Sequence, residues 1–394
     1  MNPARAPVPA GGKIFGLDLM RAVAVGLVLA DHGASMVALW ANRPPVALIS
    51  YGAFYGIEIF FVLSGFLVGG LLIRQAARTA PGGRLRAFRI FMLRRWLRTL
   101  PLYYVWMAVL LLVWVQILPS PTRHALAHTL PTYLVMAQNL FWPIQARNFY
   151  DVSWSLSVEE WFYLLAATLM FLGLVRLRRL ALPLVALLLV AGPIACRALY
   201  PPPPSPADQL VPYWLDSIGI GLWVALLEAH APRAFRAASW LAPLGALCLL
   251  EAVYGGSLAR FGAQPPLRQV IEVDYVALAI ALLVPALARW RAAGGPLAWA
   301  VTQIAALSYA LYLVHLSVLV YVGNRHLAWG LGPYGAGLVS LAATLLIAIT
   351  LSYTIERPIM RRRPDDRAVL PHSASSIASP SPEPAIAQSA PEGW

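Results

Sequence analysis

Long apolar runs constrain this 394-residue chain more than any other feature of its sequence. A run of about 20 apolar residues crosses the hydrocarbon core of a bilayer as a helix. Helices are expected because lipid offers no partners for backbone N–H and C=O groups. Hydrophobic residues make up 59% of the chain and charged residues only 12%, whereas soluble domains carry about 25% charged residues. The sequence therefore predicts an all-α, polytopic membrane bundle.

We expect about ten transmembrane helices, since ten runs have roughly the length that spanning requires. They cover residues 16–38, 50–74, 99–118, 156–175, 180–197, 212–230, 238–254, 272–290, 302–322 and 333–356. A short re-entrant or interfacial helix could form over residues 128–142, between the third and fourth spans.

The basic residues indicate how the spans are oriented. With both termini in the cytoplasm, 22 of the 30 Lys and Arg residues fall on the inner side, as the positive-inside rule requires. The net charge of +13 is therefore attributed to topology signals and headgroup contacts, and not to nucleic-acid binding. We expect a cytoplasmic segment (1–15), a membrane domain (16–363) and a disordered cytoplasmic tail (364–394) rich in Ser, Pro and Ala.

The first expected span carries ionisable side chains, which are costly inside a membrane and therefore suggest function. Arg21 and His32 are separated by close to three helical turns, so they share one face about 16 Å apart along the axis. Asp18 lies one turn before Arg21 and is expected to pair with it. This face offers an anion-binding group near the inner end and a proton acceptor in the outer half.

The second span adds a carboxylate, Glu58, at a depth similar to that of His32. We expect Glu58 to serve the same site, with an ion pair to Arg21 or to an outer arginine as the alternative. Gly65 and Gly69 stand at helix-contact spacing in this span, which favours close packing against another helix.

Arginines gather on the inner side before the third span, where eight lie between residues 74 and 98. This is more than a topology flank needs. Arg94, Arg95 and Arg98 are expected to bind the phosphates of a donor such as coenzyme A, since guanidinium forks suit phosphates. A positive-inside flank is a second, compatible explanation.

The fourth span begins near Trp154 and contains two adjacent carboxylates, Glu159 and Glu160. Ser157 and Glu160 are in capping-box register at the expected helix start. Neighbouring residues on a helix point about 100° apart, so Glu159 is left for the site.

The ninth span places Tyr312 one helical turn before His315, which falls in the outer half. We expect both to bind substrate, together with Trp154 and Ser157. The sequence shows no metal-ligand spacing, no phosphate-binding glycine loop and no nucleophile elbow, so no metal is expected. Histidines, carboxylates and a basic inner cluster suit general-base catalysis of acyl transfer better than a covalent serine mechanism.

Taken together, these segments resemble the acyltransferase 3 family of membrane-bound O-acyltransferases, over residues 14 to 363. Six motifs occur in order at compatible spacing. They are Gly16-Leu17-Asp18 with Arg21 and His32, Phe60 to Leu67, Arg94/Arg95/Arg98/Pro101, Trp154 to Tyr163, Ser308-Tyr309 with Tyr312 and His315, and Glu356-Arg357-Pro358.

The resemblance implies a multi-pass protein of the bacterial cytoplasmic (inner) membrane. It also implies an acyl-CoA donor, usually acetyl-CoA, and a carbohydrate hydroxyl as acceptor. Arg21 and His32 are implied to be required. We expect His32 to act as general base, with Arg21, Glu58 and Glu159 also in the catalytic site. The alternative is a transporter or flippase of a lipid-linked sugar, which would also use buried Arg, Glu and His residues.

Overall fold

A computed structural model describes residues 14–44, 49, 51–114, 120–140, 149–172, 178–200, 209–259 and 266–364. Within these ranges every regular element is a helix, which confirms the all-α prediction. The α-helices are α1 (Phe15–Trp40), α2 (Gly52–Arg78), α3 (Arg84–Trp114), α4 (Ser120–Leu134), α5 (Ser153–Ala167), α6 (Arg178–Leu199), α7 (Leu215–His230), α8 (Pro232–Ala237), α9 (Ala242–Ala259), α10 (Pro266–Leu287), α11 (Gly295–Gly323), α12 (Pro333–Leu351) and α13 (Arg357–Arg361).

Each of the ten expected spans overlaps one of these helices. Eight helical segments of the described chain are long and apolar enough to cross a membrane, so the chain is a multi-pass membrane protein. Helices α7 and α10 overlap the other two expected spans. The count of ten and the cytoplasmic position of both termini stay predictions.

Some expectations concern chain outside the described residues. They include the segment 1–13 and the tail 365–394. The short helix expected at 128–142 exists as α4, but it begins at Ser120 and ends at Leu134.

The arginine-rich segment before the third span is itself helical. Helix α3 begins at Arg84 rather than at residue 99 and continues through Pro101 for 31 residues. Arg and Leu are good helix formers, so the basic flank and the apolar span form one helix. Arg95 and Arg98, three residues apart, therefore lie on one face.

Helix α2 lies against α7 with almost no space between their backbones. A Cβ atom on Gly65 would lie 2.0 Å from the Ile218 carbonyl oxygen, and one on Gly221 would lie 2.1 Å from that of Val62. At Gly69, a Cβ atom would lie 2.5 Å from Leu222 Cδ1. Small residues allow such approach in membrane bundles, and the predicted close packing of Gly65 and Gly69 is confirmed.

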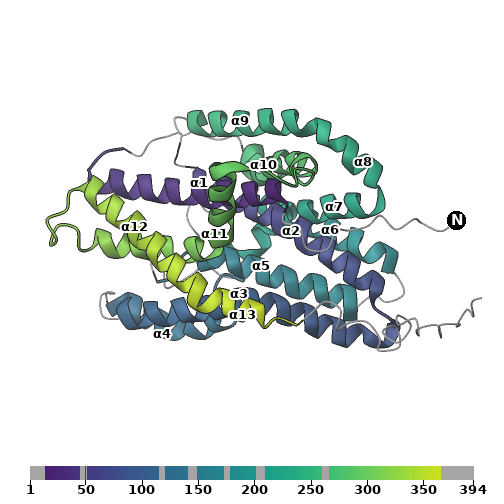
Figure 1. Cartoon of the computed structure of the whole chain (residues 1–394), viewed down its shortest axis with the longest axis horizontal. Coiled ribbons are helices and arrows are strands. Elements are labelled where there is room, and N and C mark those ends of the chain that lie inside the picture. Colours follow the sequence, from purple (N-terminus) through teal and green to yellow (C-terminus); the bar gives the residue numbers. More distant parts are fainter. Residues whose placement is uncertain are drawn as a thin grey trace, which may run out of the picture.

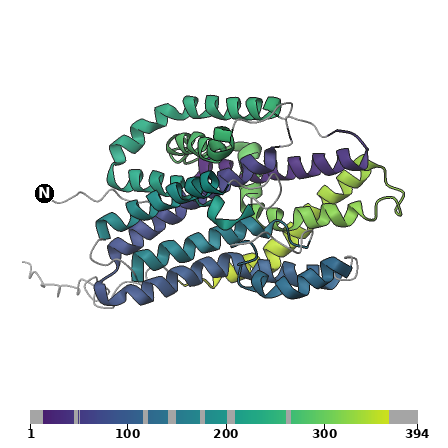
Figure 2. The same cartoon turned by 180° about the vertical axis from the view of Figure 1, so that it is seen from behind.

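Figure 1 shows α9 along one edge of the bundle and α3 with α4 along the opposite edge, and Figure 2 shows the same order from behind. Two apolar clusters fill the interior. The larger includes Phe61, Tyr103 and Phe162, and the smaller includes Val62, Ile220 and Val276. Residues of the larger cluster, such as Phe61 and Leu156, line the cavity described next.

Candidate active site

A cavity of about 280 Å³ lies among helices α1, α2, α3, α5 and α11. Most of its apolar lining comes from α2, and its polar lining consists of hydroxyls, guanidinium groups and one carboxylate. Its lining residues are Arg21, Ile57, Phe60, Phe61, Leu63, Ser64, Leu67, Val68, Leu71, Arg74, Arg95, Arg98, Thr99, Ser155, Leu156, Glu159, Tyr163, Ser308, Tyr309 and Tyr312.

Four arginines line this cavity, against one carboxylate. Arg21 donates a 2.8 Å hydrogen bond to Asp18, so the predicted pair is confirmed. Arg95 and Arg98 also line the cavity, as does Arg74. The lining is therefore positively charged, which suits an anion with several charged oxygens.

Arg94 differs from the other arginines that were predicted to bind phosphate. It is not among the lining residues, and its guanidinium donates to the Pro364 carbonyl oxygen at 2.6 Å. The structure thus brings two of the three predicted arginines to the cavity and directs the third to the segment after α13.

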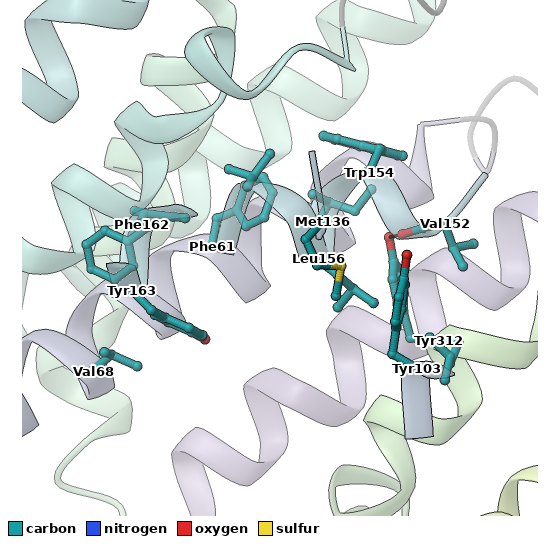
Figure 3. Close-up of a cluster of buried hydrophobic side chains, with 14 of the residues drawn as sticks. Phe61, Val68, Tyr103, Met136, Val152, Trp154, Leu156, Phe162, Tyr163 and Tyr312 are labelled. Carbon is teal, nitrogen blue, oxygen red and sulfur yellow. Dashed lines mark hydrogen bonds between the residues drawn. The ribbon is translucent and has the colours of Figure 1, made fainter. Parts of the chain in front are cut away.

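Hydroxyl groups connect the cavity wall across helices. The Tyr163 hydroxyl donates to Glu159 at 3.0 Å and lies 2.9 Å from the Ser64 hydroxyl. Glu159 therefore lies on the cavity wall and is held by a neighbour one turn later on α5. Figure 3 shows Tyr163 at one end of the apolar cluster and Tyr312 at the other.

Tyr312 forms the wall at its own end of the cavity. Its hydroxyl lies 2.6 Å from that of Ser155 and 3.2 Å from the Val152 carbonyl oxygen. Its ring packs edge-on against Phe60, with centroids 6.1 Å apart. Tyr312 thus joins α11 to α5 and α2.

Beyond Tyr312 stands a pair of histidines. His32 Nδ1 and His315 Nε2 are 2.8 Å apart, and the rings stack with centroids 5.1 Å apart. The Tyr312 ring centroid is 5.8 Å from that of His315. The two histidines were predicted to have separate roles, and the structure places them in direct contact. Neither lines the arginine-rich cavity, and His315 lines another cavity, together with Leu319 and Ser340.

Asp31 precedes His32, and its carboxylate is hydrogen-bonded to other groups. Its carboxylate accepts hydrogen bonds from the Ala53 backbone N–H at 3.0 Å and from the Ser35 hydroxyl at 3.2 Å. Asp31 therefore joins α1 to the beginning of α2.

Glu58 is fully buried, on the side of α2 that faces α7. Its carboxylate accepts a 2.5 Å hydrogen bond from Ser217, and it does not line the cavity. Nearby, Arg197 donates to Asp216 at 2.5 Å and to Asp274 at 2.6 Å. Arg197 ends the expected span 180–197, and no local pattern in the sequence links it to Asp216 or Asp274.

Polar side chains in the first turns of α5 bond to other segments and do not cap the helix. The helix begins at Ser153 and its N-cap, Val152, makes no side-chain cap, so the capping-box prediction was wrong. Ser157 donates instead to the Met136 carbonyl oxygen, and Glu160 accepts from Thr99 at 2.5 Å.

Trp154 is buried and its ring packs against Trp214, with centroids 4.9 Å apart. Neither Trp154 nor Ser157 lines the cavity. Their predicted roles in substrate binding stay predictions.

Several cavity residues were given no role of their own from the sequence, although α2 contained a usable signal. Phe60, Ser64, Leu67, Leu71 and Arg74 recur every three or four residues, which is the period of one helix face. This stripe contains both polar α2 residues that reach the cavity.

The fold defines a multi-pass membrane protein, and its bundle encloses a cavity with a positively charged lining. A family model described as an acyltransferase domain (Acyl_transf_3) matches residues 14–357. The chain belongs to this acyltransferase family, as the six sequence motifs predicted.

Two curated proteins are similar to part of the chain. The putative peptidoglycan O-acetyltransferase YrhL of Bacillus subtilis is 30% identical over 207 residues, or 49% of this chain. The peptidoglycan O-acetyltransferase OatA of Listeria monocytogenes is 28% identical over 202 residues, or 48% of this chain. Each match spans 30% of the relative's length. No solved structure matches the chain significantly.

Proposed function

We propose that this protein transfers an acyl group, in the first place acetyl, from acyl-CoA to a carbohydrate hydroxyl. The observation that supports this most directly is a cavity that is lined by four arginines and by Tyr312, whose ring contacts His315 of the His32–His315 pair. Donor binding and proton removal thus have neighbouring places in one bundle.

In this proposal Arg95 and Arg98 bind the phosphates of the donor, with Arg21 and Arg74 completing the positive lining. Arg95 and Arg98 lie in the part of α3 that precedes its apolar span, on the side predicted to face the cytoplasm. The apolar α2 wall holds the pantetheine arm, with the thioester near Tyr312.

His32 then acts as the general base. It takes the proton of the acceptor hydroxyl as the hydroxyl oxygen bonds to the thioester carbon. The carbon–sulfur bond breaks, and the thiolate leaves with the proton that His32 gives back. General-base assistance of this kind contributes about 10²–10⁴-fold to a rate.

The relatives favour a sugar of the cell envelope as acceptor, since both are named as peptidoglycan O-acetyltransferases. A protein of the bacterial inner membrane would meet such acceptors. The sugar-binding residues proposed here are Glu159, from the cavity wall, and Tyr312, from its end.

Acyl-CoA-dependent product formation tests the proposal. The protein in detergent or proteoliposomes would be given acetyl-CoA with peptidoglycan fragments or lipid-linked sugars, and released thiol and ester product would be measured together. Equal amounts of thiol and ester are expected. Movement of a lipid-linked sugar across the proteoliposome without thiol release would instead support the transporter or flippase.

A further inference from the structure

The contact between His32 and His315 can decide which ring nitrogen is basic. His315 is 1% exposed, and both of its ring nitrogens have a partner. Nδ1 lies 2.7 Å from the Tyr312 carbonyl oxygen, and Nε2 lies 2.8 Å from His32 Nδ1.

The Tyr312 carbonyl oxygen determines which nitrogen of His315 carries a hydrogen. A carbonyl oxygen can only accept a hydrogen bond, so His315 Nδ1 must carry a hydrogen and donate it. In a neutral ring the other nitrogen then carries a lone pair. His315 Nε2 is therefore an acceptor.

The tautomer of His32 follows from that of His315. Because His315 Nε2 accepts, His32 Nδ1 must carry the hydrogen that it donates. A neutral His32 then has its lone pair on Nε2, the ring nitrogen that points away from His315. Only this nitrogen can take a proton from a hydroxyl.

Both rings are expected to be neutral at rest, since a charged ring buried in a membrane bundle is costly without a paired anion. The acidic neighbour of His32 is occupied elsewhere, because the Asp31 carboxylate accepts from Ala53 and Ser35. The Nδ1 hydrogen of His32 is therefore accepted by a histidine. In many proteins a carboxylate or a backbone carbonyl accepts this hydrogen.

We propose that His315 is the positioning residue of the active site, which fixes His32 as the Nδ1–H tautomer and leaves Nε2 as the base. This inference rests on the proposed function, and it replaces the substrate-binding role predicted for His315. When His32 takes the acceptor's proton it carries a positive charge, which the His315 Nε2 lone pair stabilises through the same hydrogen bond.

The tautomer can be observed without catalysis. Full-length protein labelled with ¹⁵N-histidine would be studied by NMR in detergent, with the His32 signals assigned by their loss in His32→Gln. A protonated Nδ1 and an unprotonated Nε2 on His32 are expected. A protonated Nε2 with a bare Nδ1 in the wild type would overturn the inference, even if acyl transfer were normal.

Two substitutions of His315 give the kinetic test. Gln can donate to the Tyr312 carbonyl and accept from His32 Nδ1, whereas Phe keeps a ring without either nitrogen. His315→Phe should lower kcat about 10²-fold or more with little change in the KM for acetyl-CoA, since a wrong tautomer has cost about 10⁴-fold in a serine protease. His315→Gln should recover much of this loss.

Equal losses in both variants, or a loss confined to KM, would contradict a positioning role. In the double variant His32→Ala/His315→Phe, kcat should be no lower than in His32→Ala alone, because the residues act as one unit. If wild-type protein transfers no acyl group while the NMR shows the expected tautomer, the proposed function fails and the tautomer assignment stands.

Discussion

Ser217 donates a 2.5 Å hydrogen bond to Glu58, and this bond joins α7 to α2 inside the bundle. Glu58 lies on the face of α2 opposite to the residues, from Phe60 to Arg74, that line the cavity. The most conspicuous acidic residue of the second span is thus directed toward a helix neighbour.

We therefore expect Glu58→Gln to retain acyl transfer within a few-fold of wild type. Glutamine keeps an oxygen that can accept from Ser217, so the contact between α2 and α7 survives. Steady-state kinetics with acetyl-CoA would measure the effect. A loss approaching that of His32→Ala would restore Glu58 to the catalytic residues predicted from the sequence.

The buried triad of Arg197, Asp216 and Asp274 should contribute to stability rather than to chemistry. Arg197→Met leaves two buried carboxylates without their cation, and removing one partner of a buried pair costs about 3–5 kcal/mol. Thermal unfolding in detergent should show a clear fall in Tm. Arg233→Met, at an exposed position of α8, is the control and should leave the Tm unchanged; equal Tm values for both variants would contradict this role.

The α2–α7 contact makes a second stability prediction. Gly65→Ala places a methyl group 2.0 Å from the Ile218 carbonyl oxygen, and such overpacking costs typically about 1–3 kcal/mol. Gly26→Ala is a matched helical control, since nothing lies within 4 Å of its added Cβ. Yield of folded protein and Tm should fall for Gly65→Ala only. Similar behaviour of the two variants would contradict the close approach of the helices.

Substitutions of Arg94, Arg95 and Arg98 should affect donor binding to different extents, although the three residues lie close together in the sequence. Arg95→Ala and Arg98→Ala remove guanidinium groups from the cavity and should raise the KM for acyl-CoA about tenfold or more, since a hydrogen bond to a charged group contributes about 1.5–3 kcal/mol. Arg94→Ala should have a much smaller effect because Arg94 bonds the Pro364 carbonyl. An equal rise in KM for all three would support a phosphate site formed by all three arginines, as the sequence predicted.

Much of this architecture could be predicted from the sequence because the bilayer leaves few choices. Apolar run length located a helix at each expected span, and helical periodicity placed Asp18 beside Arg21. Motifs also singled out Glu159 and Tyr312, which line the cavity, and His32 and His315, which contact each other.

The errors concern which helix a polar side chain faces. Ser157 was expected to cap α5, but tertiary packing directs it to the Met136 carbonyl. His315 and His32 are 283 residues apart in the sequence, and no local pattern reports a contact of that separation. Arg94 and Arg95 look alike in the sequence, and only the rotation of α3 against its neighbours separates them.

The most direct test of this account is label transfer by His32→Ala. Membranes with matched amounts of wild type, His32→Ala and the exposed-histidine control His230→Ala would receive labelled acetyl-CoA and cell-envelope sugars. Ester label should form with wild type and with His230→Ala, and should fall about 10²–10⁴-fold with His32→Ala. Undiminished label with His32→Ala would contradict the assignment of His32 as the general base.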